Sequence, residues 1–332
     1  MRAVVIDQPG TIAVRDVPDP VAAEGQVIVR VDACGVCGTD VHIVDGEFPP
    51  TPYPIIPGHE FSGELVDLGP TPPDGLSVGD RVAVDPSLFC GRCDDCRRGR
   101  GNLCLNWGAI GDTVDGAFAE FVVVPAANVY QLPSSMDSRS AALVEPLSCT
   151  VHGVRRLGPV LGESVLVVGA GTMGLLLLQL LVRAGACRLV VVDRVASRRD
   201  AAKALGATDA VNAIGDLDGE KFSAIVDVTG SVAAIEEAFA SVQRGGRLLI
   251  FGVAPAGAMA RVEPFRIYND EITVIGSMAV LHSYGAALEM MASGAIETSP
   301  LLTHALPLDE FAEALSMVRG GRGIKVHILP NG

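Results

Sequence analysis

The pattern of apolar positions changes its character near residue 164. Before that point, short apolar runs rich in β-branched residues alternate with Pro, Gly and Asp, and they read AVVI, QVIVRVDA, GELVDLG, DRVAVDP and AEFVVVP. Short strands separated by turn residues are typical of an antiparallel sheet in a barrel or sandwich. The first part of the chain is therefore predicted to be a β-rich domain.

From Ser164 onward, the predicted strands are almost entirely apolar, and they read SVLVVGAG, RLVVVDR, SAIVDVTG, RLLIFGV and ITVIGSM. Helical stretches separate most of them, namely LLLLQLLVRAG, SRRDAAKALG and VAAIEEAFASV. Apolar strands that alternate with helices indicate a parallel sheet covered on both faces. We expect an α/β fold with a doubly wound parallel sheet in this part.

The tail follows the last predicted strand and contains two amphipathic helical segments, SYGAALEMMASG and LDEFAEALSMVRGG. A chain of 332 residues exceeds what one hydrophobic core usually supports, so two domains are expected. We expect the tail to return to the first domain. The predicted division gives residues 1–147 and 279–332 to one domain and residues 148–278 to the other.

Composition and charge narrow the possible partners. Hydrophobic residues make up 49% of the chain and charged residues 19%, which is typical of a globular protein. The longest apolar run, GLLLLQLLV, is too short for a membrane span. A net charge of −14 argues against binding to nucleic acid or to an anionic membrane surface, because both would be repelled. We therefore expect a small-molecule substrate, and a start of MRAVVIDQPG, which lacks a secretion signal, predicts a cytoplasmic location.

Half of the eight cysteines lie within fifteen residues, in the pattern CxxCxxCx₇C formed by Cys90, Cys93, Cys96 and Cys104. Two disulfides would also use four cysteines, but a reducing compartment favours metal. Four thiolates at this spacing indicate a tetrahedral zinc site. Four sulfur ligands leave no open position for substrate, so this zinc is predicted to be structural.

A glycine-rich turn follows the first apolar strand of the second part. Its pattern is GxGxxG, with Thr172 and Met173 between the second and third glycines, and the glycines are Gly169, Gly171 and Gly174. The preceding strand and the following helix are the context that dinucleotide binding requires. The glycines allow a tight turn, a close approach of the backbone to a pyrophosphate, and close packing of helix against strand. A purely structural glycine turn in another α/β domain is the alternative.

Asp193 lies 19 residues after the last of these glycines, at the end of the next strand. A carboxylate at this position accepts hydrogen bonds from the adenosine ribose and repels a 2′-phosphate, which favours NAD over NADP. Arg194, Arg198 and Arg199 leave NADP open as the less favoured cofactor. Because ligands bind at the carboxyl ends of parallel strands, Val253 and Met278 are expected to flank the nicotinamide.

A second set of metal-ligand types is spread along the chain, consisting of Cys37, His59, Glu60 and Glu145. Cysteine, histidine and carboxylate from separate segments are the usual ligands of an open, catalytic zinc site. Each residue also has an ordinary explanation, since Cys37 could form a redox CxxC pair with Cys34 and Glu145 could be a charge at the start of a helix. Spacing alone leaves both interpretations open.

Seven segments in order along the chain resemble the zinc-dependent medium-chain dehydrogenases. They are GVCGTDVH, GHE, VGDRV, the four-cysteine segment, GAFAEFVVVP, VEPLS and GAGTMG. The resemblance covers essentially the whole chain and implies a GroES-like catalytic domain joined to a Rossmann domain that binds NAD. The VEPLS segment resembles the sorbitol (polyol) dehydrogenase branch, to which the threonine dehydrogenases are near relatives.

The resemblance also implies roles for single residues. Cys37, His59 and Glu60 would bind the catalytic zinc, and Glu145 would be either a direct ligand or a partner of the zinc-bound water. Thr39 would pass on the substrate proton, and His42 would relay it outward. Each chain would hold two zinc ions, and the protein would be a homodimer or a homotetramer.

The implied reaction moves a hydride from a secondary alcohol to NAD and gives a ketone. Members of the sorbitol type carry an arginine-containing segment where this chain has MAVLHSYG, so sugar alcohols other than sorbitol, cyclitols and amino alcohols all stay open as substrates. Threonine or diol oxidation is the nearest alternative. More distant alternatives are a zinc-free reductase or non-catalytic relative, and a lyase or epimerase that uses its cofactor transiently.

Overall fold

A computed structural model describes residues 1–48 and 51–332 and confirms the predicted α/β fold class. The chain divides into two compact units. Unit 1 contains Met1–Ser148 and Val280–Gly332, and unit 2 contains Cys149–Ala279. In the described ranges, no helix is both long and apolar enough to cross a membrane.

Unit 1 is built on a seven-stranded sheet in the order β16-β17-β3-β4-β5-β9, with β8 paired to β3. Its pairs are antiparallel except β16 with β17, which is parallel. Its strands are β3 (Gln26–Val36), β4 (Glu60–Asp67), β5 (Arg81–Val84), β8 (Phe121–Pro125), β9 (Val129–Gln131), β16 (Leu302–Pro307) and β17 (Lys325–Leu329). Because β3 is long and mostly buried, it forms the centre of this sheet.

The rest of unit 1 surrounds this sheet. The hairpin of β1 (Arg2–Gln8) and β2 (Thr11–Asp16) forms a separate two-stranded sheet. Phe118 and Phe311 pack in the core with their ring centroids 4.7 Å apart. The helices of unit 1 are α1 (Gly38–Asp45), α2 (Asp94–Arg97), α3 (Ser138–Ala141), α9 (Tyr284–Ala292) and α10 (Phe311–Arg319), and α4 (Val144–Leu157) runs across the boundary into unit 2.

The tail contains the two predicted helices, α9 and α10, together with two strands that the apolar pattern did not predict. The last strand, β17, pairs antiparallel with β3, so the end of the chain completes the sheet of unit 1. The sequence KVHIL of β17 opens with a lysine and contains a histidine, and these polar residues hid a strand whose first four residues are buried.

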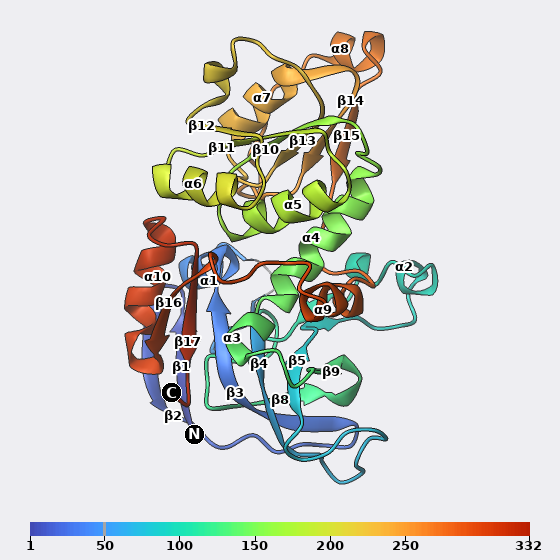
Figure 1. The fold of residues 1–332 in the computed structure, drawn as a ribbon. Helices are drawn as coiled ribbons and strands as arrows, with labels where there is room; N and C mark the ends of the chain where they lie inside the picture. Colours follow the sequence, from blue (N-terminus) through green and yellow to red (C-terminus); the bar gives the residue numbers. More distant parts are fainter. Residues whose placement is uncertain (49–50) are drawn as a thin grey trace. The chain divides into compact units, whose positions relative to one another are not determined.

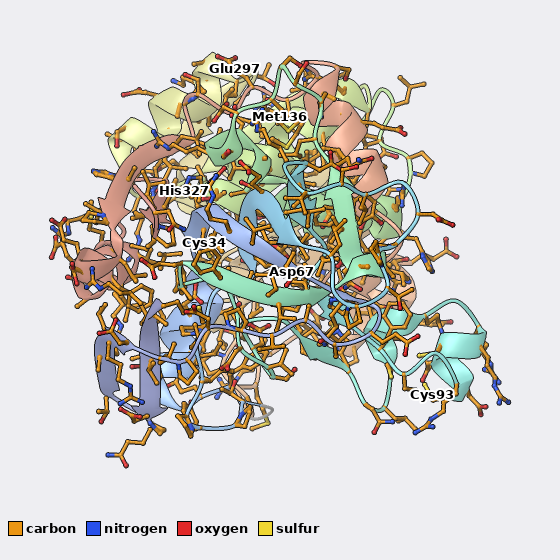
Figure 2. All side chains as sticks on the ribbon, turned by 90° about the horizontal axis from the view of Figure 1, so that it is seen from below. Cys34, Asp67, Cys93, Met136, Glu297 and His327 are labelled. Carbon is orange, nitrogen blue, oxygen red and sulfur yellow. The ribbon has the colours of Figure 1, made fainter. Side chains whose placement is uncertain are left out.

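The four-cysteine segment forms a small lobe of unit 1, bounded by the short strands β6 (Ser87–Leu88) and β7 (Gly108–Ala109). Figure 2 shows Cys93 on this lobe, beyond the strands of the sheet, whereas Cys34 and His327 lie on the sheet itself.

Unit 2 is a six-stranded parallel sheet in the order β12-β11-β10-β13-β14-β15. Within this unit, α5 and α6 cover one face of the sheet and α7 covers the other (Figure 1), as in a doubly wound fold. The strands are β10 (Ser164–Val168), β11 (Arg188–Val192), β12 (Asp209–Val211), β13 (Phe222–Asp227), β14 (Val242–Ile250) and β15 (Thr273–Gly276). The helices are α5 (Thr172–Arg183), α6 (Ala196–Ala204), α7 (Val232–Ser241) and α8 (Pro264–Asn269).

Candidate metal and cofactor sites

The four cysteines of the lobe come together as the sequence pattern predicts. One sulfur from each of Cys90, Cys93, Cys96 and Cys104 lies within 4.8 Å of the others. None of the eight cysteines, all of which fall in the described ranges, forms a disulfide. Backbone N–H groups of Cys90 and Asn106 donate to the Cys104 sulfur at 3.3 Å, which favours a thiolate there.

The acidities of these thiols explain why the lobe needs a cation. Backbone N–H donors lower the pKa of Cys90 to about 6. Burial and the neighbouring sulfurs raise the pKa of Cys96 to about 12. Backbone N–H donors also lower the pKa of Cys93. The lobe thus favours thiolates at Cys90 and Cys93 and resists a further one at Cys96, because like charges repel. A divalent cation that accepts four sulfur donors removes this conflict, and zinc suits the donor set.

The second candidate site begins at Cys37, at the amino end of α1. The Cys37 sulfur accepts a hydrogen bond from the Thr39 N–H at 3.3 Å, and the Cys37 N–H donates to the Asp40 carboxylate at 2.9 Å. This reciprocal cap fixes the direction of the thiol. The sulfur lies 3.2 Å from Nε2 of His59. Burial raises the pKa of Cys37, and the charge of His59 opposes that effect.

His59 lies at the centre of this site and is buried. Its Nδ1 lies 3.1 Å from Oδ1 of Asp112 and 4.0 Å from Oδ1 of Asp40. Burial by itself lowers the pKa of His59, but the charges of Cys37 and Asp112 outweigh it and raise the pKa well above the usual value. Burial raises the pKa of Asp40 to about 6. The sequence pattern gave no sign of Asp112 as a member of this group.

Glu60, at the start of β4, is buried against Lys325 at the start of β17. The Lys325 ammonium donates to Oε2 of Glu60 and, at 3.4 Å, to the carbonyl of Val36. A Cβ on Gly35 would lie 2.2 Å from the same Glu60 oxygen, so a larger residue there would displace this carboxylate. Burial alone would lower the pKa of Lys325, but the carboxylate of Glu60 raises it. Lys325 is a second residue that sequence reasoning missed.

The predicted ligands fall into two overlapping donor sets, and the first set also includes Asp40, which was not predicted. Cys37, Asp40 and His59 offer ligand atoms within 4.8 Å of one another, and so do His59, Glu60 and Glu145. His59 belongs to both sets, and Glu145 reaches the second from the first turn of α4. Sulfur, imidazole and carboxylate donors are those that catalytic zinc uses, so the residues present fit this metal.

The predicted proton-relay residues lie next to this site on α1. Thr39 is half-buried and follows Cys37 by two positions. His42 is also half-buried, and its Nδ1 lies 2.8 Å from the exposed Glu47 carboxylate. The helix therefore connects Thr39, beside the half-buried Cys37 thiol, to a histidine whose partner is exposed to solvent.

In unit 2, the glycine-rich turn lies between β10 and α5. Gly169 has φ +106° and would place a Cβ 2.8 Å from Val228, and a Cβ on Gly174 would lie 1.9 Å from the Gly169 carbonyl. Neither position tolerates a side chain. Gly171 caps α5 and has open space where its Cβ would be, and Thr172 and Met173 open the helix. A helix amino end with an uncovered glycine suits a phosphate group.

Asp193 follows β11 and faces this turn. One carboxylate oxygen accepts the Ala170 N–H and the other accepts the Val195 N–H, each at 2.8 Å. Each oxygen keeps a second lone pair for a ligand hydroxyl. The Arg199 guanidinium donates to the Asp193 carbonyl at 2.7 Å, and Arg198 lies next to it on α6. Val253 and Met278, after β14 and β15, are 75% and 39% exposed, so both are accessible to a ligand.

Asp227 is a further residue that sequence reasoning missed. It ends β13 and is fully buried. Its carboxylate accepts the backbone N–H groups of Thr229 and Gly230, both at 3.1 Å, and the Thr229 hydroxyl at 2.6 Å. An aspartate at the end of an apolar strand was the available signal. It fixes the turn at the carboxyl edge of the sheet, where nucleotides bind in such folds.

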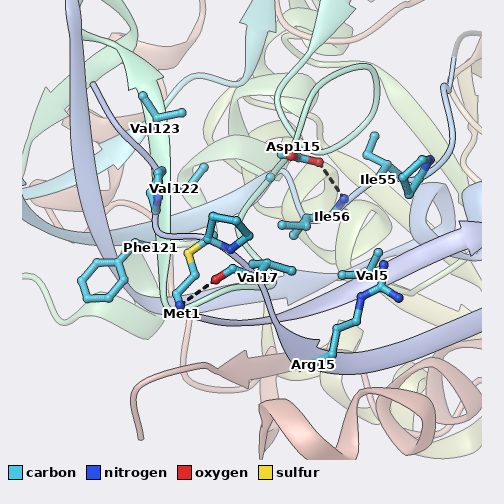
Figure 3. Close-up of a pocket in the computed structure, with 14 residues that line it drawn as sticks. Met1, Val5, Arg15, Val17, Ile55, Ile56, Asp115, Phe121, Val122 and Val123 are labelled. Carbon is cyan, nitrogen blue, oxygen red and sulfur yellow. Dashed lines mark hydrogen bonds between the residues drawn. The ribbon is translucent and has the colours of Figure 1, made fainter. Parts of the chain in front are cut away.

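A groove of about 430 Å³ opens elsewhere on unit 1, lined by Met1, Val17, Pro18, Ile56, Val122 and neighbouring residues (Figure 3). The Ile56 N–H donates to Asp115 at its edge. None of the candidate metal ligands lines this groove.

A GroES-like unit with two sets of metal ligands, together with a Rossmann-type sheet, defines the class of metal-dependent dehydrogenases. Family models agree. Residues 23–134 match the alcohol dehydrogenase GroES-like domain, and residues 172–293 match the zinc-binding dehydrogenase domain. The chain belongs to the zinc-dependent medium-chain dehydrogenase family, as the sequence motifs predicted.

Individual relatives match over nearly their whole lengths. D-arabinitol dehydrogenase 1 of Uromyces fabae is 35% identical over 100% of this chain and 97% of its own. An L-threonine 3-dehydrogenase of Rhizobium etli is 34% identical over 94% and 93%. A crystal structure from Sinorhizobium meliloti, described as a zinc-binding dehydrogenase bound to NADP, superposes with a TM-score of 0.94 at 35% identity and 99% coverage of both chains.

Proposed function

We propose that this protein is a zinc-dependent oxidoreductase that moves a hydride from a secondary alcohol to NAD and produces a ketone. A polyol, sugar alcohol or cyclitol is the proposed substrate class. The observation that carries the proposal is the buried pair of donor sets that share His59, since sulfur, imidazole and carboxylate together form an open type of zinc site. The relative that acts on D-arabinitol supports the polyol class.

Oxidation of threonine, another amino alcohol or a diol is the second candidate. It is favoured by the 34% identity to an L-threonine 3-dehydrogenase over almost the whole chain. Within one family, the two candidates share the donor sets and the glycine-rich turn, so they differ in the groups that surround the substrate.

We assign one zinc to Cys37, His59 and Glu60, with Glu145 as a further ligand or as the partner of a bound water, and a second to the four cysteines of the lobe. When bound at the first site, zinc would act as a Lewis acid that makes a substrate hydroxyl more acidic. Residues of the chain would carry the proton of that hydroxyl toward solvent. Thr39 accepts it beside Cys37, and His42 passes it toward Glu47, which holds the His42 ring at 2.8 Å and is exposed to water.

We assign the cofactor to residues 148–278, with the pyrophosphate at Gly169, Gly171, Thr172, Met173 and Gly174. When bound, the nicotinamide would accept the hydride. Asp193 would accept the ribose hydroxyls, and Arg198, Val253 and Met278 would contact other parts of the cofactor. Because Asp193 would repel a 2′-phosphate, NAD is the proposed cofactor and NADP the alternative.

A substitution at Asp193 tests this preference. Asp193→Ala removes the acceptor and the negative charge, so kcat/KM for NAD is expected to fall about tenfold or more, and that for NADP is expected to rise. Steady-state kinetics with both cofactors measure the change. An unchanged preference would contradict the assignment of Asp193.

We also propose that the protein is a homodimer or homotetramer located in the cytoplasm. Strand β15 lies at one end of the sheet of unit 2, and Val274 on this strand and Tyr268 before it are 47% and 81% exposed. An apolar strand at a sheet edge tends to pair with another strand. Sedimentation of the wild-type protein and of Val274→Lys tests this, because the substitution should shift the assembly toward a smaller species. A monomeric wild-type protein would exclude the proposed oligomer.

The proposed cytoplasmic location is consistent with the lobe, because a reducing compartment would keep the lobe cysteines available for metal.

The reaction itself is tested by the formation of reduced cofactor. Zinc-loaded protein is mixed with pentitols, hexitols, inositols, threonine and simple diols, each with NAD and with NADP, and absorbance at the reduced-nicotinamide band is followed. The proposal expects turnover with a polyol or cyclitol. Turnover with threonine alone would favour the second candidate, and no net reduction with any alcohol would contradict both.

A further inference from the structure

We propose that Asp112 is the positioning residue of the proposed catalytic zinc site, and that it holds Nδ1 of His59 so that Nε2 is presented to the metal. This inference rests on the proposed zinc site. It assigns a role to a residue outside the predicted ligand and relay sets. Asp112 belongs to none of the donor sets, so it would act by orienting His59 and not as a ligand.

The two nitrogens of His59 face different groups. Nε2 lies 3.2 Å from the Cys37 sulfur, on the side of the proposed ligands. Nδ1 lies 3.1 Å from Oδ1 of Asp112 on the other side. Both atoms are buried, and among the described residues neither forms a hydrogen bond of regular geometry, so their 3.1 Å separation is an ion-pair contact. Each atom is therefore the group available to satisfy the other.

Asp40 is the competing carboxylate, and its geometry is less suitable. Its nearer oxygen lies 4.0 Å from Nδ1, beyond hydrogen-bond distance. Its other oxygen accepts the Cys37 N–H at 2.9 Å as part of the cap of α1. One Asp40 oxygen is thus committed to the helix start, and its other oxygen, also buried, lies 4.0 Å from the imidazole nitrogen, whereas that of Asp112 lies at 3.1 Å.

The loop that carries Asp112 is docked firmly on the backbone beside His59. A Cβ on Gly111 or on Gly116 would lie 2.3 Å from the carbonyl of Gly58, so both glycines allow direct backbone contact. The Ala117 N–H donates to that same carbonyl at 2.9 Å. Within the loop, the Gly111 N–H donates to Val114 at 2.8 Å. Asp112, 5% exposed, is therefore held against His59 by rigid backbone.

Metal-binding histidines commonly donate their second N–H to a carboxylate, which fixes the tautomer and the ring direction. Loss of such a partner typically lowers metal affinity about 10- to 100-fold. The affinity of the His59 zinc should therefore depend on Asp112, and the affinity of the four-cysteine zinc should not.

The test measures zinc affinity by competition with a chromophoric chelator on the full-length, zinc-loaded protein. Asp112→Asn removes the acceptor charge, Asp40→Asn alters the competing carboxylate, and Asp115→Asn is the matched control from the same loop. We expect Asp112→Asn to lower the affinity for one of the two zinc ions about 10- to 100-fold and to leave the affinity for the other unchanged. Asp115→Asn should change both affinities less than about threefold, and Asp40→Asn, whose carboxylate belongs to the Cys37 donor set, should weaken the His59 site less than Asp112→Asn does.

Asp112→Glu provides a second variant, because it keeps the carboxylate and the fold while shifting the oxygen. Its zinc affinity should lie between those of the wild type and Asp112→Asn, and the visible spectrum of the cobalt-substituted protein should change in the same order. An Asp40→Asn effect as large as that of Asp112→Asn would overturn the proposal. Unchanged affinity in either folded Asp112 variant would also overturn it. If the wild type binds two zinc ions but reduces neither cofactor with any alcohol, the proposed function fails, and the zinc affinities of the Asp112 variants still decide the present proposal.

Discussion

The two metal-ligand groups of unit 1 contrast in almost every physical respect. The lobe cysteines come from one short segment, use a single donor type and are mostly only half-buried. The His59 site collects donors from α1, the start of β4 and the first turn of α4, and most of its residues are buried. A closed shell of four sulfurs leaves no open position and stabilises a loop. The mixed donor set of the His59 site is typical of a zinc site that can also bind water or substrate, and one of its carboxylates, Glu60, is paired to Lys325.

The two sites also differ in the free energy that burial of their charged groups takes from the stability of the folded protein. The lobe exposes its segment to water, so solvent screens its charges. The His59 site gathers two buried acids, Asp40 and Asp112, and the ion pair of Glu60 with Lys325, all below 6% exposed. Buried charges are costly unless they are paired. This region should therefore be sensitive to the loss of a single partner, and the lobe should be sensitive chiefly to the loss of metal.

The largest expected effect comes from His59→Ala. The substitution removes the donor that both sets share, so turnover should fall about 10²- to 10³-fold, the scale of losing a principal electrostatic group in a catalytic site. Initial rates with the best alcohol substrate measure it. His304→Ala on β16, outside both donor sets, is the control and should keep its rate. Retained turnover in His59→Ala would move the chemistry elsewhere.

Next in size is Lys325→Met. Glu60 would remain buried without its cation, so the free energy of unfolding should fall by about 3–5 kcal/mol, as for other broken buried pairs. Urea denaturation of the metal-free proteins, prepared with a chelator, measures this, because a zinc ion on Glu60 would itself replace the lost cation. The double variant Glu60→Gln with Lys325→Met removes both charges and should recover part of the loss. A loss below about 1 kcal/mol in Lys325→Met would show that the pair is not as dry as its burial indicates.

Cys93→Ser should have a smaller effect, and on stability rather than on rate. If free zinc stands at about 100 times its dissociation constant, losing this site removes about 2.7 kcal/mol of stability. Thermal unfolding is the measurement, with turnover assayed at low temperature. Cys187→Ser, at an exposed cysteine in unit 2, is the control. A large rate loss with unchanged stability would contradict a structural lobe.

The smallest effect concerns His327, which lies on β17 two residues from Lys325 and is fully buried. Burial, followed by the charge of Lys325, lowers the pKa of His327 to about 3. The folded pKa lies below the usual 6.5, so the unfolded chain binds more protons between these values. Stability is therefore full above about pH 6.5 and falls as the pH drops, by about 1.4 kcal/mol per unit.

The wild type should thus lose about 2 kcal/mol more between pH 8 and pH 5 than His327→Gln does. Denaturation curves of both proteins at the two pH values give this difference. At pH 8 the histidine is neutral in the folded and the unfolded protein, so the stability difference between the two proteins at that pH measures the effect of the substitution on packing. Equal losses in the two proteins would mean that water reaches His327, and the contrast with the exposed lobe would weaken.

Local patterns in the sequence were sufficient for much of this organisation. The four cysteines lie within one segment, and the glycine turn, its strand and Asp193 follow a fixed spacing, so each could be recognised without a structure. Asp112 and Lys325 could not, because the loop and the strand that carry them are brought to His59 and Glu60 only by tertiary contacts. Asp112 belongs to a polar loop, and Lys325 was hidden at the start of an apolar strand. Pairing across 265 residues leaves no periodic signal.

The most direct test combines metal content with turnover in one experiment. His59→Ala and Cys93→Ser are purified side by side with the wild type, zinc per chain is measured by elemental analysis, and reduction of NAD is followed with the best alcohol. The account predicts two zinc ions in the wild type, one in each variant, and turnover in Cys93→Ser but not in His59→Ala. Turnover in His59→Ala and its loss in a folded Cys93→Ser would contradict it.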